Sequence, residues 1–147
     1  MNHFDWKNIK HFRKEEFNHP KRMAYAHVKR LDKFRDNLGS SIIITSDYRE
    51  SETSMHGKGL ATDIIAPKIT NLFEFYLEAE RFNFTGLGIY PHWQLNGNVI
   101  GGLHVDSRSP KNGRGARWIC ILVNGKQEYI TLNQENLQRY IINGWDT

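Results

Sequence analysis

The chain is poor in cysteine and has no long hydrophobic run. Cys120 is the single cysteine of 147 residues, so the chain cannot form an internal disulfide framework. It lies in the apolar run WICILV, where a buried and unreactive thiol is the favoured interpretation. No segment approaches the ~18 apolar residues of a membrane span, and the N-terminal sequence MNHFDWKNIK lacks the apolar core of a signal peptide. We therefore expect synthesis in the cytoplasm without a signal peptide.

The composition is that of a globular protein. Hydrophobic residues make up 39% of the chain, which excludes general disorder. No repeat, low-complexity tract or linker divides the sequence. We predict one domain over residues 1–147, with an N-terminal arm over about residues 1–19, and we expect a monomer.

The net charge of +4 raises the question of an anionic partner. Much of the positive charge lies in residues 21–35, where apolar side chains recur at helical spacing. The basic residues there are thus best interpreted as the solvated face of an amphipathic helix. We therefore do not favour nucleic acid as a partner. The net positive charge would suit an anionic polymer such as a bacterial cell wall as well as it would suit nucleic acid.

The pattern of apolar residues and breakers predicts an α+β fold. Alternating or β-branched runs indicate strands, and longer amphipathic stretches indicate helices, with Thr70 as the predicted cap of the second helix. The expected architecture is a mostly antiparallel central sheet flanked by helices. The predicted helices span residues 20–37, 70–82 and 134–143; the predicted strands span 41–46, 60–65, 86–91, 99–107, 117–123 and 127–132, the last two joined by an Asn-Gly turn at 124–125.

Two short segments carry a candidate metal site. His56 and Asp63 stand seven positions apart, and Gly57 and Gly59 between them allow the chain to fold back. Asp63 lies on a predicted strand with apolar neighbours, where an unpaired carboxylate is costly. In GLHVD, His104 and Asp106 are two apart and so share one face of a strand. His56, Asp63 and His104 together suit zinc, and three protein ligands leave one position open, as in catalytic sites.

The segment SMHGKGLATD resembles the Ser-x-His-x-x-Gly-x-Ala-x-Asp signature of the zinc D-alanyl-D-alanine carboxypeptidase family. That family includes phage L-alanyl-D-glutamate endopeptidases and is related to the zinc domain of hedgehog proteins. The match covers Ser54, His56, Gly59, Ala61 and Asp63 without a gap. Further similar segments follow the family order from about residue 10 to residue 120: HFRKEEF, ITSDYR, GLGIYP, HVDSR and RW. The resemblance implies a hedgehog-like zinc-peptidase fold.

The resemblance also implies roles for individual residues. His56, Asp63 and His104 would bind zinc, and Arg49 would bind substrate and stabilise charge on the scissile carbonyl, which is the chemistry that amide hydrolysis requires. Ser54 of the signature would contribute to substrate binding. His92 would contact substrate beside Trp93, although an exposed turn histidine is an equal alternative.

Arg108 is a further candidate for substrate binding. The alternative is that Arg108 fixes the site from behind through its charge, as Trp118 would through packing.

The general base departs from the family pattern. Many members carry Glu or Asp three residues before the last histidine ligand, where this chain has Gly101. Asp106 is the obvious substitute as a catalytic proton acceptor, because it shares a strand face with His104. Alternatively, Asp106 orients a ligand histidine. A second departure is Asp47, which replaces the usual glycine before Tyr48.

These features predict a zinc-dependent peptidase that hydrolyses peptidoglycan stem peptides near a D-amino acid, as carboxypeptidase or endopeptidase. The lack of an export signal and the phage members of the family favour an endolysin or a virion-associated wall hydrolase. The alternative is a zinc-containing binding or virion structural protein that has lost hydrolysis, and Gly101 is the feature in its favour.

Overall fold

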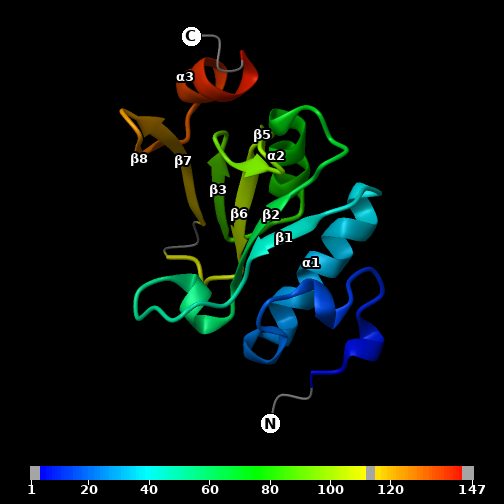
Figure 1. Cartoon of the computed structure of the whole chain (residues 1–147). Helices are drawn as coiled ribbons and strands as arrows, with labels where there is room; N and C mark the ends of the chain where they lie inside the picture. Colours follow the sequence, from blue (N-terminus) through cyan, green and yellow to red (C-terminus); the bar gives the residue numbers. More distant parts are fainter. Residues whose placement is uncertain (1–3, 112–114, 144–147) are drawn as a thin grey trace.

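A computed structural model describes residues 4–111 and 115–143 (Figure 1). The first three residues of the predicted arm lie outside this part. Among the described residues, no helix has both the length and the apolar character needed to cross a membrane. In chain order the elements are η1 (Trp6–Asn8), η2 (Lys14–Glu16), η3 (Pro20–Arg22), α1 (Tyr25–Leu38), β1 (Ile43–Ser46), η4 (Met55–Lys58), β2 (Ala61–Ile65), α2 (Leu72–Arg81), β3 (Gly86–Tyr90), β4 (Gln94–Leu95), β5 (Asn98–Val99), β6 (Gly102–Asp106), β7 (Ala116–Val123), β8 (Lys126–Thr131), α3 (Gln134–Leu137) and the π-helical turn η5 (Gln138–Ile142).

The main sheet has six strands in the order β1-β2-β6-β3-β7-β8. The pairings are antiparallel except that β3 and β7 run parallel, with Gly88 opposite Trp118. The α+β class is therefore confirmed, but the sheet is mixed, which corrects the prediction of a mostly antiparallel sheet. The reason is topological: β6 inserts between β2 and β3, so that β7 must pair with the free edge of β3. The parallel pairing of β3 with β7 joins segments distant in sequence, so no local sequence pattern predicts it.

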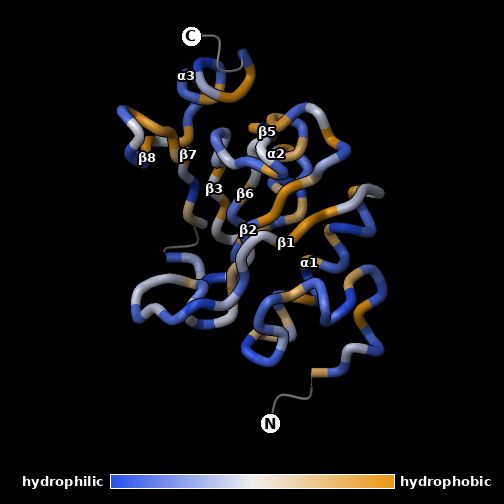
Figure 2. The backbone as a smooth tube through the Cα atoms, viewed as in Figure 1, coloured by the Kyte–Doolittle hydropathy of each residue, from blue (hydrophilic) through white to orange (hydrophobic). Residues whose placement is uncertain are grey.

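Helices α1 and α2 cover one face of the sheet. Phe34 of α1 stacks on Phe75 of α2 with 6.1 Å between ring centroids, and Phe34 meets Phe84 edge-on at 5.5 Å. The strand residues of this core alternate along each strand; they are Ile64, Leu87, Ile89, Leu103, Val105, Ile119 and Ile121. Their neighbours in sequence point to the opposite face. Figure 2 shows hydrophobic stretches along β1 and the β7–β8 hairpin, whereas the segment around η4 is mostly hydrophilic or neutral.

Two helix starts differ from the predictions. The first long helix begins at Tyr25 and not at Pro20, because Ala24 is extended and its N–H donates to the carbonyl of Gly59 at 2.9 Å. The second helix is capped by Asn71, whose side chain accepts from two backbone N–H groups, and not by Thr70. The predicted Asn-Gly turn is present, with positive φ at Asn124 and Gly125.

Glycines clear space on the face opposite the helices. A Cβ at Gly86 would lie 2.0 Å from the Asp106 carboxylate, one at Gly88 2.3 Å from the Trp118 indole, and one at Gly102 2.6 Å from the Trp93 ring. The side chains of Asp106, Trp118 and Trp93 therefore lie flat against the sheet, over neighbouring strands. This arrangement brings the polar residues of β2 and β6 into one layer.

Gly88→Ala is expected to lower the free energy of unfolding by about 1–3 kcal/mol, because the added methyl group must displace the Trp118 ring. Urea unfolding measures the change. In a Trp118→Ala background the same substitution should cost much less, since the methyl group would occupy vacated space. An equal cost in both backgrounds would contradict packing of Trp118 over Gly88.

Candidate metal centre

The loop before β2 holds His56 in a fixed orientation. Ser54 caps η4 by accepting a hydrogen bond from the His56 backbone N–H at 3.1 Å, and Gly59 ends η4 in the left-handed region with φ of 68°. The His56 ring is 1% exposed, and its Nδ1–H donates to the carbonyl of Asp47 at 2.6 Å. This bond leaves the Nε2 lone pair free. Nε2 is buried and makes no hydrogen bond within the described residues.

Asp63 and His104 lie directly opposite each other on β2 and β6. Asp63 Oδ1 is 3.2 Å from His104 Nδ1 and 3.4 Å from His56 Nε2. Burial alone raises the pKa of Asp63, but contacts with His104 and His56 outweigh it and hold the pKa below its ordinary value. For His104, burial lowers the pKa, while Asp106 and Asp63 more than compensate and raise it.

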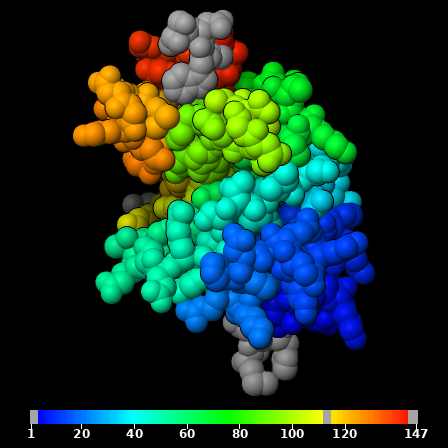
Figure 3. All heavy atoms as spheres, in the orientation of Figure 1, coloured from blue at the N-terminus to red at the C-terminus, as the bar shows by residue number. Residues whose placement is uncertain are grey.

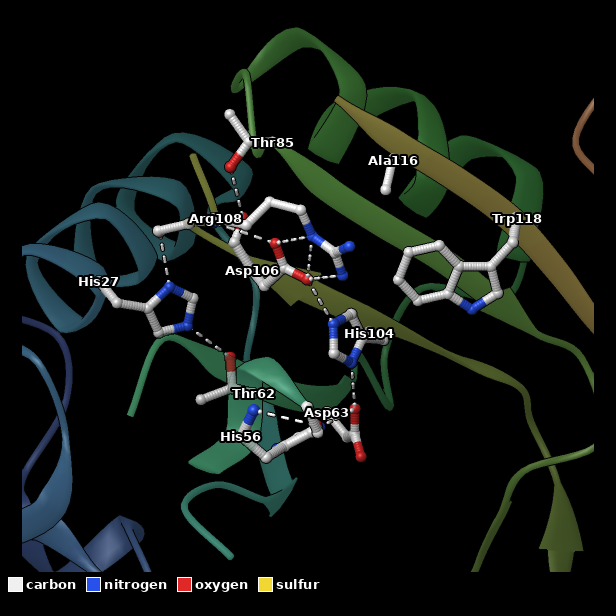
Figure 4. Close-up of polar contacts among 12 residues, drawn as sticks. His27, His56, Thr62, Asp63, Thr85, His104, Asp106, Arg108, Ala116 and Trp118 are labelled. Atoms are coloured by element: carbon white, nitrogen blue, oxygen red, sulfur yellow. Dashed lines mark hydrogen bonds and ion pairs between the residues drawn. The ribbon is translucent and has the colours of Figure 1, made fainter. Parts of the chain in front are cut away.

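The three side chains form a cluster that can hold a metal ion. One ligand atom from each of His56, Asp63 and His104 lies within 4.8 Å of the others, and all three residues are buried (Figure 4). The second nitrogen of each histidine is occupied by a protein acceptor, which is the arrangement that metal-ligating histidines require. His56 Nε2, His104 Nδ1 and a carboxylate oxygen of Asp63 thus converge on one point. Without a cation or proton between them, this convergence would be unfavourable.

Asp106 lies on the far side of the His104 ring from Asp63. Its Oδ2 accepts from His104 Nε2 at 2.8 Å, whereas Asp63 faces Nδ1 (Figure 4). The guanidinium of Arg108 donates to both carboxylate oxygens, at 2.6–3.1 Å. Burial raises the pKa of Asp106, but the hydrogen bonds from His104 and Arg108 dominate and hold it far below its ordinary value. The carboxylate is 0% exposed and saturated with donors.

A cleft of about 390 Å³ opens over the cluster. Arg49 stands at its wall, 58% exposed, with Nη2 3.9 Å from Asp63 Oδ2. On another side Tyr90 and Trp93 stack at 4.2 Å between ring centroids. Among the described residues that line the cleft, Asp63 is the one acidic side chain. The complete lining is Thr45, Arg49, Asp63, Ile65, Tyr90, Trp93, Gln94, His104, Gln127 and Tyr129.

Three residues predicted to bind substrate do not line this cleft. Ser54 caps η4, Arg108 pairs with Asp106, and His92 packs near the Tyr90 ring with 6.0 Å between centroids. The cleft is instead lined in part by Gln127 and Tyr129 of β8. The sequence contained no signal for these two, because only the β7–β8 pairing brings the hairpin over the cluster.

The structure gives a physical role to Asp47. Its buried carboxylate accepts from the His19 backbone N–H at 2.9 Å and from the His19 ring Nδ1 at 3.1 Å. Its own carbonyl holds His56. Asp47 therefore links the N-terminal arm to the loop that orients a candidate ligand.

His27 is a buried polar residue of α1. Its ring pairs with the hydroxyl groups of Ser107 at 2.8 Å and Thr62 at 3.2 Å, linking α1 to the sheet (Figure 4). Burial lowers the pKa of His27 to about 3. The folded protein therefore keeps this imidazole neutral.

The neutral His27 predicts acid sensitivity in the metal-free protein. The unfolded chain binds a proton here at about pH 6.5, so the stability that a neutral His27 provides is complete above that pH and is lost as the pH falls toward 3. Between pH 7 and pH 5 the wild type should lose about 2 kcal/mol relative to His27→Gln, by urea unfolding. An equal pH dependence in both proteins would contradict the prediction.

Comparison of the chain with models of known families, with curated proteins and with solved structures finds no match. Any functional conclusion therefore depends on the residues and the geometry of the site.

Proposed function

We propose that this protein is a zinc-dependent peptidase that hydrolyses stem peptides of peptidoglycan near a D-amino acid, acting at the bacterial cell wall as an endolysin or a virion-associated enzyme. The observation that carries the proposal is the convergence of His56 Nε2, Asp63 Oδ1 and His104 Nδ1 beneath an open cleft with Arg49 at its wall. The resemblance of SMHGKGLATD to the zinc carboxypeptidase signature supplies the substrate class.

The donor set suits zinc. Two imidazoles and one carboxylate are common catalytic zinc ligands, and their number leaves a position for substrate or water. When bound, zinc would supply a Lewis acid for the scissile carbonyl and would lower the pKa of water. The same donors also suit Fe(II), so metal analysis of the purified protein is part of the test.

The protein's own residues would bind and orient the peptide. Arg49 is exposed in the cleft, and its guanidinium can donate to a substrate carboxylate or to the oxygen that becomes negatively charged. Tyr90 and Trp93 form an apolar wall, and Gln94 and Gln127 offer amide groups to a peptide backbone. These features favour a short polar peptide as the ligand.

The geometry favours the orienting role for Asp106. Its carboxylate holds the Nε2 edge of His104 and is itself held by Arg108, so it lies away from the cleft. We expect Asp106→Asn to lower zinc affinity by about 10- to 100-fold, and hydrolysis to recover at saturating zinc. Zinc titration alongside a peptidase assay checks this.

Asp32→Asn is the matched control, because Asp32 is also buried and accepts backbone N–H groups, but from Lys10 and His11 of the arm. It should leave zinc affinity unchanged. Loss of hydrolysis in Asp106→Asn with zinc still fully bound would instead identify Asp106 as the catalytic base.

The proposal is tested by release of new amino termini from purified peptidoglycan. Release should disappear with a chelator and return with zinc, and mass analysis of the fragments would identify the bond. One tightly bound zinc without release would favour the alternative, a binding or virion structural protein. The alternative has an observation in its favour: at position 101, where many members of the similar family have an acid, glycine has φ of 81° and a Cβ would meet Leu72.

A further inference from the structure

A second and larger groove is lined by the N-terminal arm, by η3 and the start of α1, and by Lys58 of η4. Its volume is about 910 Å³. Ala24 N–H donates to the carbonyl of Gly59, and a Cβ at Gly59 would meet the Arg22 carbonyl at 2.2 Å, so η3 and the residues before α1 are tightly joined to η4. Figure 3 shows the N-terminal part of the chain (blue) against the segment that carries η4 (teal). The lining residues at issue are Phe4, Trp6, Lys14, Lys21, Tyr25 and Lys58.

Aromatic side chains contribute an apolar surface to the groove. Phe4 stacks on Trp6 at 4.5 Å, Trp6 contacts Phe17 at 5.5 Å, and Phe4 meets Tyr25 edge-on at 5.1 Å. Phe17 is buried, while Phe4, Trp6 and Tyr25 are half-buried. The cluster thus anchors the arm and still offers apolar surface to a ligand.

The remaining lining is strongly cationic. Lys14, Lys21 and Lys58 are exposed, and none forms an ion pair with another described residue. Arg22 also lines the groove and donates to the Tyr48 hydroxyl. Glu15 is the one acidic side chain in the described lining. Unpaired cations beside apolar surface complement a ligand that carries both negative charges and apolar faces.

We propose that this groove binds an acidic glycan, with sugar rings against the aromatic surface and carboxylates at Lys14, Lys21 and Lys58. This inference rests on the proposed function and extends it: the ligand is the peptidoglycan glycan strand with its carboxylate-bearing stem peptides. Lys58 is two residues from His56, so a strand held here lies beside the loop of the metal cluster. Single-stranded nucleic acid could engage the same lysines and aromatic side chains, and the test below separates it from the glycan.

The test measures equilibrium binding of fluorescently labelled soluble glycan strands, released from peptidoglycan with stem peptides attached, to the full chain after chelation. The triple variant Lys14→Gln, Lys21→Gln, Lys58→Gln is expected to bind about 10-fold more weakly. Lys10→Gln, Lys33→Gln, Lys68→Gln removes the same charge from exposed lysines outside the groove and should bind like the wild type. Glycan strands whose carboxylates have been amidated should bind the wild type about 10-fold more weakly than intact strands do. This is the same loss as that expected for intact strands and the triple variant at Lys14, Lys21 and Lys58.

Two results would overturn the proposal: equal weakening in both triple variants, or binding of oligothymidylate as tight as that of the strands and dependent on the same three lysines. Circular dichroism shows whether each variant is folded. Because the chelated protein cannot use a bound metal, failure of this binding is distinct from failure of the proposed hydrolysis, which is measured separately on short stem peptides with the zinc-loaded wild type.

Discussion

His56→Ala should abolish hydrolysis and lower zinc affinity by more than about 100-fold, since loss of a ligand is expected to exceed the 10- to 100-fold cost of losing a partner that orients one. His56 Nε2 is buried, has no hydrogen-bond partner in the described part of the chain, and lies 3.4 Å from Asp63 Oδ1. Its removal leaves Asp63 and His104 as the remaining candidate ligands of the cluster. Equilibrium dialysis with zinc and release of amino termini from peptidoglycan measure the two effects.

His11→Ala is the matched control for this experiment. His11 is exposed, pairs with Asp36 at 3.3 Å, and belongs to neither the cluster nor its cleft. It should retain one zinc per chain and full hydrolysis. A His56→Ala protein that still binds zinc with wild-type affinity would show that the metal is held elsewhere, and the proposed centre would be wrong.

Arg49→Ala should reduce kcat by about 100-fold while zinc stays bound, because removal of a single oxyanion donor has costs of this order. The Arg49 guanidinium is 3.9 Å from Asp63 and is the one cation that lines the cleft in the described part of the chain. Steady-state kinetics on a defined stem peptide separate kcat from KM. Partial recovery of kcat by added guanidinium would indicate that the missing charge, rather than a disturbed fold, causes the loss.

Arg81→Ala serves as the comparison. Arg81 is 69% exposed and pairs with Glu78 on α2. Its loss should leave kcat and KM unchanged. If Arg49→Ala raises KM and leaves kcat intact, Arg49 binds the ground state of the peptide and does not act on the developing charge.

The sequence could predict most elements of this fold because their signals are local. The helical spacing in residues 25–38, the β-branched run before Ser46 and the Asn-Gly turn each depend on near neighbours. The mixed sheet could not be predicted in this way, since the parallel pairing of β3 with β7 joins segments 30 residues apart in register, as Gly88 and Trp118 show. Nor could the cap of α2 be predicted: Thr70 and Asn71 are both suitable capping residues, and in the structure Asn71 is the one that caps the helix.

The same division applies to the site. The sequence alone was enough to name His56, Asp63 and His104 as candidate ligands. It also placed His104 and Asp106 on one face of a strand, because side chains alternate with a period of two residues along a strand. Only the tertiary structure decided which ring nitrogen faces which carboxylate. It set Asp106 behind His104, placed Asp47 between the arm and His56, and brought β8 over the cleft, because each of these depends on contacts between segments distant in sequence.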